Sequence, residues 1–168
     1  MNIPNDYDNL REVLDKIQSR ASDGALAEAL LNTEELIEVY PNEPAVWNLR
    51  GYIFGQQGEI LKAIDARSTA ISLCDKEPHY FYMRGIDLFS LGKYTEAISD
   101  FSTVIELCDY YKSDYYRAGA YFFRADASVR VGDYSRARVD CAHIEDGMTT
   151  WTDKLRSKAD ILADCQER

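Results

Sequence analysis

Apolar and polar positions in residues 78–111 follow the pattern of two amphipathic helices joined by a turn. Phe81, Gly85 and Leu88 fall on one face of a first helix. A second helix has an apolar face at the same three-to-four spacing, formed by Ala97, Phe101, Val104 and Ile105. Gly92 precedes the second helix, and glycine readily ends a helix in the left-handed conformation. The pattern predicts a helical hairpin.

This hairpin pattern recurs along the chain with a period of 34 residues. Pairs of identical residues at this shift include Gly51/Gly85, Gly58/Gly92, Ala63/Ala97, Ile64/Ile98 and Cys74/Cys108. The units are predicted at about 10–43, 44–77, 78–111 and 118–151. The fourth follows at a shift of 40, because six residues are inserted between Asp109 and Ala118. One such hairpin cannot bury its own apolar face, so neighbouring hairpins are expected to stack.

The repeated residues resemble the tetratricopeptide repeat (TPR) family. The family pattern is an aromatic residue, a small residue four positions later, a turn glycine, and small residues on the second helix. This chain shows it as Trp47, Gly51, Gly58, Ala63 and Ala70, as Phe81, Gly85, Gly92, Tyr94, Ala97 and Phe101, and as Tyr121, Ala125, Gly132, Tyr134 and Ala137. The first unit departs most, with Ile17 at the place of Gly51 and Gly85. The resemblance covers most of the chain. It implies one all-α domain over 1–168, a right-handed superhelix of about four helix hairpins.

A capping helix is expected after the repeats, at about 150–166. Trp151, Leu155, Ala159 and Leu162 would lie on one face of it. Terminal repeats need a cap with a polar outer side, which such a helix would provide.

The resemblance also implies a concave groove lined by the first helix of each unit. The candidate partner-binding residues carried over to that groove are Asn48, Tyr52, Gln56, Tyr82, Phe89, Phe122, Asp126 and Arg130. Asp126 and Arg130 are one helical turn apart, so they form either an ion pair within the helix or a polar anchor for a basic partner. Some family members grip a C-terminal carboxylate with Lys, Arg and Asn at these positions. The positions here hold mostly aromatic residues, so that clamp is not expected.

The insertion contains several tyrosines and no glycine or proline. If the next helix starts early, Tyr111, Tyr115, Phe122 and Val129 fall on one side of it. Tyr111 and Tyr115 would then add an aromatic ridge to the partner-binding surface. The alternative is that they pack on the second helix of the third unit.

Charge narrows the class of partner. The chain has 29 acidic and 19 basic side chains and a net charge of −10. This balance disfavours nucleic acid, whose phosphates need neutralising cations. It favours fast association with a basic protein, although solubility alone would also explain it. No stretch of apolar residues is long enough for a membrane span, and the first residues lack the pattern of a signal peptide. A cytoplasmic location is therefore expected.

Residues that carry catalytic chemistry are not arranged in any known pattern. The four cysteines form no Cys-x-x-Cys pair and are expected to be reduced core residues. The two histidines lie outside any zinc-binding or nucleophile motif. We therefore expect no enzyme activity, cofactor, metal ion or small-molecule substrate.

Three functions remain open. The first is a bacterial immunity protein that binds and neutralises a basic toxin domain. The stretches Tyr115–Arg117, Tyr121–Ala125 and Leu155–Leu162 look similar to small bacterial proteins of that kind. The second is a cytoplasmic secretion chaperone or scaffold that holds an extended peptide in the groove. The third is an enzyme or an enzyme regulator, although the absence of a catalytic arrangement argues against catalysis itself. One fold can host many roles, so the fold does not decide among them.

Overall fold

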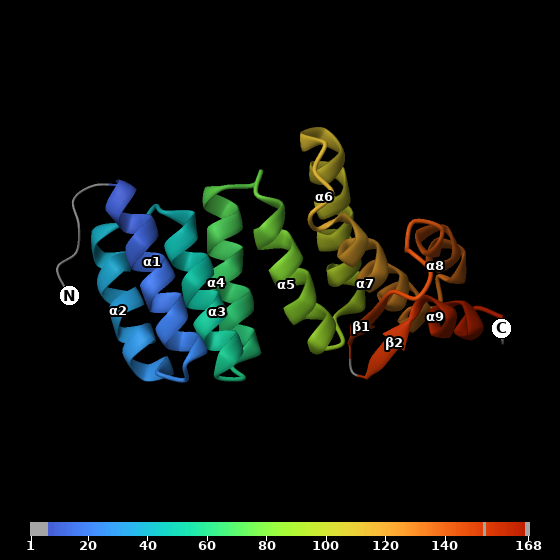
Figure 1. Cartoon of the computed structure of the whole chain (residues 1–168), viewed down its shortest axis with the longest axis horizontal. Coiled ribbons are helices and arrows are strands. Elements are labelled where there is room, and N and C mark those ends of the chain that lie inside the picture. Colours follow the sequence, from blue (N-terminus) through green and yellow to red (C-terminus); the bar gives the residue numbers. More distant parts are fainter. Residues whose placement is uncertain (1–6, 153, 167–168) are drawn as a thin grey trace. The chain divides into compact units, whose positions relative to one another are not determined.

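A computed structural model describes residues 7–152 and 154–166 of the chain, which form nine helices and two short strands (Figure 1). The chain divides into two compact units, residues 1–75 and residues 76–168. Within each unit the helices pack in sequential order as TPR-like hairpins, so the predicted mostly helical fold class is confirmed.

The first unit contains two helical hairpins. They are built from α1 (Tyr7–Ser22), α2 (Leu26–Val39), α3 (Pro44–Gln56) and α4 (Ile60–Leu73). Their shared core contains Ile17, Leu36, Val46 and Ile53, which are almost completely buried. Ile17 replaces the small residue of the other repeats and fills the core, so this departure from the pattern is compatible with the hairpin.

The second unit contains two more hairpins and a C-terminal extension. Its helices are α5 (Pro78–Ser90), α6 (Tyr94–Tyr111), α7 (Arg117–Arg130), α8 (Tyr134–Cys141) and α9 (Lys158–Asp164), and its strands are β1 (Thr149–Trp151) and β2 (Leu155–Ser157). Phe101 and Phe123 stack in the core with ring centroids 5.5 Å apart. Phe122, Ala125 and Ile161 belong to a buried cluster formed by α7, α8 and the C-terminal segment.

The ends of the helices are set by local sequence signals that recur with the repeat. Pro44 and Pro78 begin α3 and α5, where the missing backbone donor costs nothing. The turn glycines Gly58 and Gly92 have φ angles of +77° and +74°, a conformation that other residues adopt at a cost. The turn glycines between the two helices of a hairpin therefore act as predicted.

Two arginine–aspartate pairs join the helices within the hairpins of the second unit. Arg84 binds Asp100 through two hydrogen bonds of 2.8 and 2.7 Å. Arg124 binds Asp140 in the same way, at 2.9 and 2.6 Å. The residues of each pair are 16 positions apart, so equivalent positions in the two hairpins carry the same two-bond contact.

The C-terminal segment differs from the single helix expected at about 150–166. Residues 149–157 form an antiparallel β-hairpin in which Trp151 pairs with Leu155, and α9 begins only at Lys158. Thr149, Thr150 and Trp151 favour strands over helices. Ser157 then starts α9 with a capping box, its side chain accepting from the Asp160 backbone while Asp160 accepts from Ser157.

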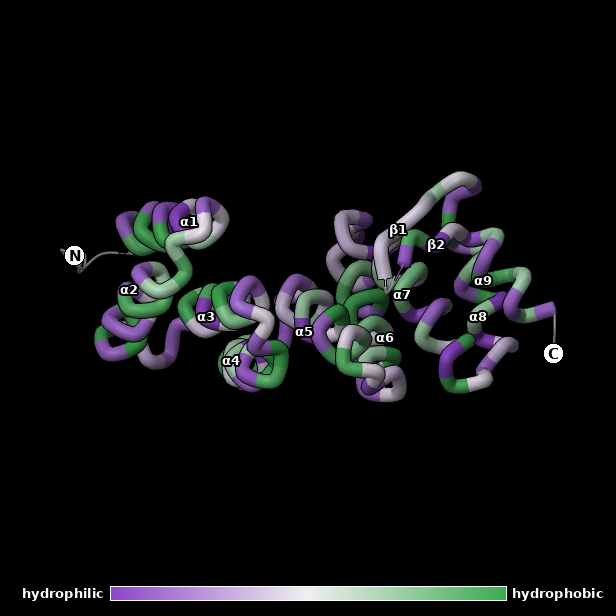
Figure 2. The backbone as a smooth tube through the Cα atoms, turned by 90° about the horizontal axis from the view of Figure 1, so that it is seen from below, coloured by the Kyte–Doolittle hydropathy of each residue, from purple (hydrophilic) through white to green (hydrophobic). Residues whose placement is uncertain are grey.

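Hydrophobic and hydrophilic residues alternate along the helices, as expected for amphipathic helices (Figure 2). No helix within the described ranges has the length and apolar character needed to cross a membrane.

Three of the four cysteines lie in the core, as predicted. Cys108, Cys141 and Cys165 are buried, whereas Cys74 is half-buried at the end of α4. Burial raises the pKa of the three core thiols, that of Cys141 from 9.0 to about 11. Only a thiolate attacks a disulfide reagent.

We therefore expect a thiol reagent near neutral pH to modify one cysteine, Cys74, in the folded protein and four in denaturant. The Cys74→Ser variant should leave no fast-reacting thiol. Fast labelling of that variant would contradict the buried assignment.

Alkaline pH should also destabilise the fold through Cys141. Its folded pKa lies above its unfolded value, so its contribution to stability is fully present below about pH 9 and is lost as the pH rises through about 11. Urea unfolding of the Cys141→Ala variant should depend less steeply on pH in this window than unfolding of the wild type. If the stability of both proteins depends equally on pH, the Cys141 thiol does not contribute to the alkaline loss of stability.

Candidate partner-binding surface

The candidate residues of the first unit lie along α3. Asn48 and Tyr52 are half-buried, and Gln56 is exposed. The Tyr52 hydroxyl lies 2.9 Å from the hydroxyl oxygen of Ser22 on α1, so this tyrosine ties two helices together. Asn48, Tyr52 and Gln56 follow one another at four-residue spacing and therefore share a face of α3.

The candidate aromatics on α5 are used mainly for packing. Tyr82 contacts Tyr116 at a ring-centroid distance of 5.1 Å and Phe123 at 6.2 Å, and burial raises its pKa. Phe89 is buried and meets the ring of Phe123 edge to face at 5.6 Å. Tyr82 therefore offers a partner only part of its surface, and Phe89 offers almost none.

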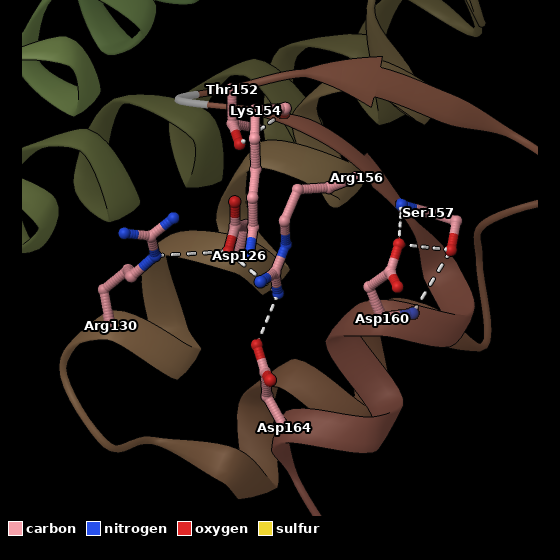
Figure 3. Close-up of polar contacts among 8 residues, drawn as sticks. All are labelled: Asp126, Arg130, Thr152, Lys154, Arg156, Ser157, Asp160 and Asp164. Atoms are coloured by element: carbon pink, nitrogen blue, oxygen red, sulfur yellow. Dashed lines mark hydrogen bonds and ion pairs between the residues drawn. The ribbon is translucent and has the colours of Figure 1, made fainter.

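Phe122 and Asp126 on α7 are completely buried, so the expectation that they face an open groove is wrong. The physical reason is the C-terminal segment, which packs on this helix. One Asp126 oxygen lies 3.2 Å from Nη2 of Arg156 on β2 and 3.5 Å from Nε of Arg130 (Figure 3). The second carboxylate of this network is Asp164 on α9, 2.8 Å from the same Arg156 nitrogen.

The two interpretations of Asp126 and Arg130 are thereby resolved in favour of the ion pair within the helix. Asp126 cannot anchor a partner while Arg156 covers it. Arg130 keeps part of its surface and lies over the rings of Phe89 and Tyr94 at 6.0 and 5.7 Å. Sequence reasoning missed Arg156, which is 30 positions from Asp126 and belongs to no recognisable motif.

The insertion does not extend α7 towards the N-terminus, so the predicted helical ridge is wrong. Helix α6 continues to Tyr111, Lys112 adopts a left-handed conformation with φ of +53°, and α7 begins at Arg117. Arg117 closes the loop with ion pairs to Asp109 at 2.6 Å and to Asp114 at 2.9 Å.

The tyrosines of this insertion are nevertheless open to solvent. Tyr110, Tyr111 and Tyr115 are 78%, 46% and 84% exposed, and we call these three residues the tyrosine patch. The alternative prediction, that Tyr111 and Tyr115 pack on the second helix of the third unit, is therefore also wrong. Tyr116 packs instead, with its hydroxyl 2.9 Å from Nδ1 of His79. Tyr110 was not among the predicted residues, although it precedes Tyr111 directly.

A polar pocket of about 500 Å³ opens beside α6, on residues that do not belong to the predicted groove. Its walls come from α6, α7 and α8 and the turn before α8. The charged residues that line it are Glu106, Arg124, Asp133, Arg136 and Asp140. No cluster of potential metal ligands occurs in residues 7–152 and 154–166.

The comparisons with known proteins identify the fold. The sequence matches no protein-family model, and it matches no curated protein. Among solved structures, a TPR protein from Parabacteroides merdae aligns with a TM-score of 0.66 and 19% identity, over 83% of this chain and 52% of that chain. The chain thus spans about half the length of the Parabacteroides protein.

Two further TPR structures are similar. YrrB, described as a TPR protein with an unusual peptide-binding site, aligns with a TM-score of 0.67 and 18% identity, over 77% of this chain and 63% of its own. A putative kinesin light chain from Podosopora anserina with nearly identical TPR-like repeats reaches a TM-score of 0.70 at 11% identity, over 83% of this chain and 75% of its own. The fold is therefore that of TPR proteins.

Proposed function

We propose that the chain is a non-catalytic protein-binding module whose partner is a basic protein domain, and that it acts as a bacterial immunity protein that neutralises a toxin. The observation that carries the proposal is the tyrosine patch. Tyrosine is enriched at binding hot spots, and three exposed copies are concentrated in the insertion between the third and fourth repeats. The resemblance of Tyr115–Arg117 and Tyr121–Ala125 to small immunity proteins favours a toxin as the partner.

The charge of the chain supports a basic partner. Residues 1–75 carry 13 acidic and six basic side chains, and residues 76–168 carry 16 and 13. Both units are therefore negative, and their field would accelerate encounter with a positive domain at low salt. Many toxins of this class are basic nucleases, which an acidic protein can cover.

The second candidate function is a secretion chaperone that holds an extended peptide in the groove. The peptide-binding site described for YrrB is the observation that favours it. The burial of Phe122, Asp126 and Phe89 counts against it, because a peptide in the groove could not contact these three side chains.

The test is capture of partners on the tagged full chain, followed by calorimetry with the purified partner. We expect one basic protein at one-to-one stoichiometry. Replacing Tyr110, Tyr111 and Tyr115 by serine should weaken the complex by about 30-fold or more, because removal of hot-spot aromatics costs 2 kcal/mol or more. The Leu61→Ser variant, which alters an exposed apolar residue of the first unit, should bind like the wild type.

Two outcomes would overturn the proposal. The first is capture of several unrelated exported proteins that share a short extended segment, which is the behaviour of a chaperone. The second is a tyrosine variant that binds its partner as tightly as the Leu61→Ser control. Repeating the titration at about 50 mM and about 500 mM salt separates charge from aromatic contact, because salt screens only the former strongly.

A further inference from the structure

The pocket beside α6 offers a second, chemically distinct contact for the proposed partner. It is formed within the second unit by neighbouring helices that contact one another, α6 with α7 and α7 with α8 (Figure 1). The pocket is open to solvent, and its volume of about 500 Å³ leaves room for a ligand group of several atoms. A single metal ion would not fill it.

The charges of the pocket leave one carboxylate unpaired. Arg124 is fully engaged, because it binds Asp140 through two hydrogen bonds and donates to the Ser102 hydroxyl at 2.9 Å. Arg136 faces Asp133 at 3.5 Å. Glu106 is exposed and has no partner among the side chains that the structure describes. The free charge of the pocket is therefore negative, which favours a cation and disfavours a phosphate or a carboxylate.

The remaining walls suit a long cationic side chain. Val139 is 61% exposed and lines the pocket, so it can contact the aliphatic stem of such a side chain. Glu106 and Tyr110 are four positions apart on α6 and therefore neighbours on one helical face. A guanidinium bound to Glu106 would lie close to the exposed ring of Tyr110, where cation–π attraction adds to the ion pair.

We infer that this pocket receives an arginine side chain of the partner, with Glu106 accepting its hydrogen bonds, Val139 contacting its stem and Tyr110 contacting its guanidinium. Arginine fits better than lysine because its planar fork can bond a carboxylate with two nitrogens while one face rests on an aromatic ring. The inference rests on the proposed function, because it assigns the basic partner a specific anchor in the pocket beside α6. It also connects the acidic pocket with the tyrosine patch, since Tyr110 of the patch is one helical turn from Glu106 of the pocket.

The test is a nuclear magnetic resonance titration of the isotope-labelled full chain with the peptide acetyl-Gly-Arg-Gly-amide. The matched probe is the same peptide with citrulline, which has the shape of arginine without its charge. We expect the arginine peptide to shift the backbone amides of Glu106, Tyr110, Arg136 and Val139, and the citrulline peptide to leave them in place. Glu106→Gln should weaken binding about fivefold, the effect of one partly exposed charge-assisted hydrogen bond.

The control is Glu96→Gln, which removes the same charge from an exposed position of the same helix outside the pocket. This variant should bind the arginine peptide like the wild type. The inference is overturned if the two variants weaken binding equally, if the shifted amides lie outside the pocket, or if the arginine peptide causes no shifts. None of these results affects the captured partner or its dependence on the tyrosine patch, so failure of the anchor is distinguishable from failure of the proposed function.

Discussion

Replacing Asp126 by alanine should lower the free energy of unfolding by about 3 kcal/mol, the cost of breaking a buried ion pair from one side. Asp126 is completely buried, and the side chain of Arg156 is only 5% exposed. Without the aspartate, the Arg156 guanidinium keeps a single carboxylate, that of Asp164, and loses a charge partner in a region closed to water (Figure 3). The β-hairpin is attached to α7 through this contact, so its packing should loosen as well. Urea unfolding measures the loss.

A second variant separates the charge from the loss of side-chain volume. Asp126→Ala combined with Arg156→Met removes both charges, and we expect it to be more stable than Asp126→Ala alone, because no guanidinium remains buried with only one of its two carboxylates. Asp146→Asn is the exposed control. Asp146 pairs with Lys158 at 2.7 Å but is 94% exposed, so its replacement should leave stability nearly unchanged. If the double variant is no more stable than Asp126→Ala, the loss of stability does not come from the buried charge of Arg156.

The hairpins could be predicted because their determinants are local and repeat. Pro44 and Pro78 mark the starts of helices, and Gly58 and Gly92 mark turns that need a positive φ. These signals act within a few residues, so one sequence suffices to recognise them. The predicted apolar face of α6 is likewise buried, since it follows from helical spacing alone.

The C-terminal segment shows why a helical period can mislead. Trp151, Leu155 and Ala159 match the spacing of one helical face, yet Trp151 and Leu155 are opposite each other across a β-hairpin and both are exposed. The competing signals were present. Two threonines and a tryptophan favour a strand, and Ser157 with Asp160 forms a capping box that places the helix start at Lys158.

The site was harder to predict because burial depends on contacts between distant residues. Asp126 occupies a position that the family pattern places in the groove, but Arg156 covers it from 30 residues away. The prediction for the insertion was wrong for a different reason. Lys112 ends α6 in a left-handed conformation, which lysine rarely adopts, so the sequence carried no glycine to mark the end.

A buried arginine was missed as well. Arg67 stands 34 positions before Phe101, at the equivalent place of the second repeat, and is also buried. A Cβ atom built on Gly51 would lie 2.8 Å from the Arg67 side chain, just as one built on Gly85 would meet Phe101. The small residue of the first helix thus faces whatever fills this position, a ring in one repeat and an arginine stem in another.

This close approach makes Gly85 intolerant of larger side chains. A Cβ atom at Gly85 would lie 2.8 and 2.9 Å from two carbons of the Phe101 ring, closer than carbon atoms pack. The ring cannot easily move, because Phe101 is completely buried and is stacked on Phe123 with an angle of 17° between the rings. Helix propensity alone would favour alanine over glycine by about 1 kcal/mol. Overpacking costs about 1–3 kcal/mol and should outweigh that gain.

We therefore expect Gly85→Val, which adds two further methyl groups and a stiff side chain, to lower the free energy of unfolding by about 3 kcal/mol. Gly85→Ala should lose less, because its higher helix propensity offsets part of the overlap. Combining Gly85→Ala with Phe101→Leu shortens the opposing ring, so the loss caused by the alanine should be smaller in that background than beside Phe101. Urea unfolding of the four proteins completes the double-mutant cycle. If the alanine costs as much beside leucine as beside phenylalanine, the aromatic ring is not what restricts this position.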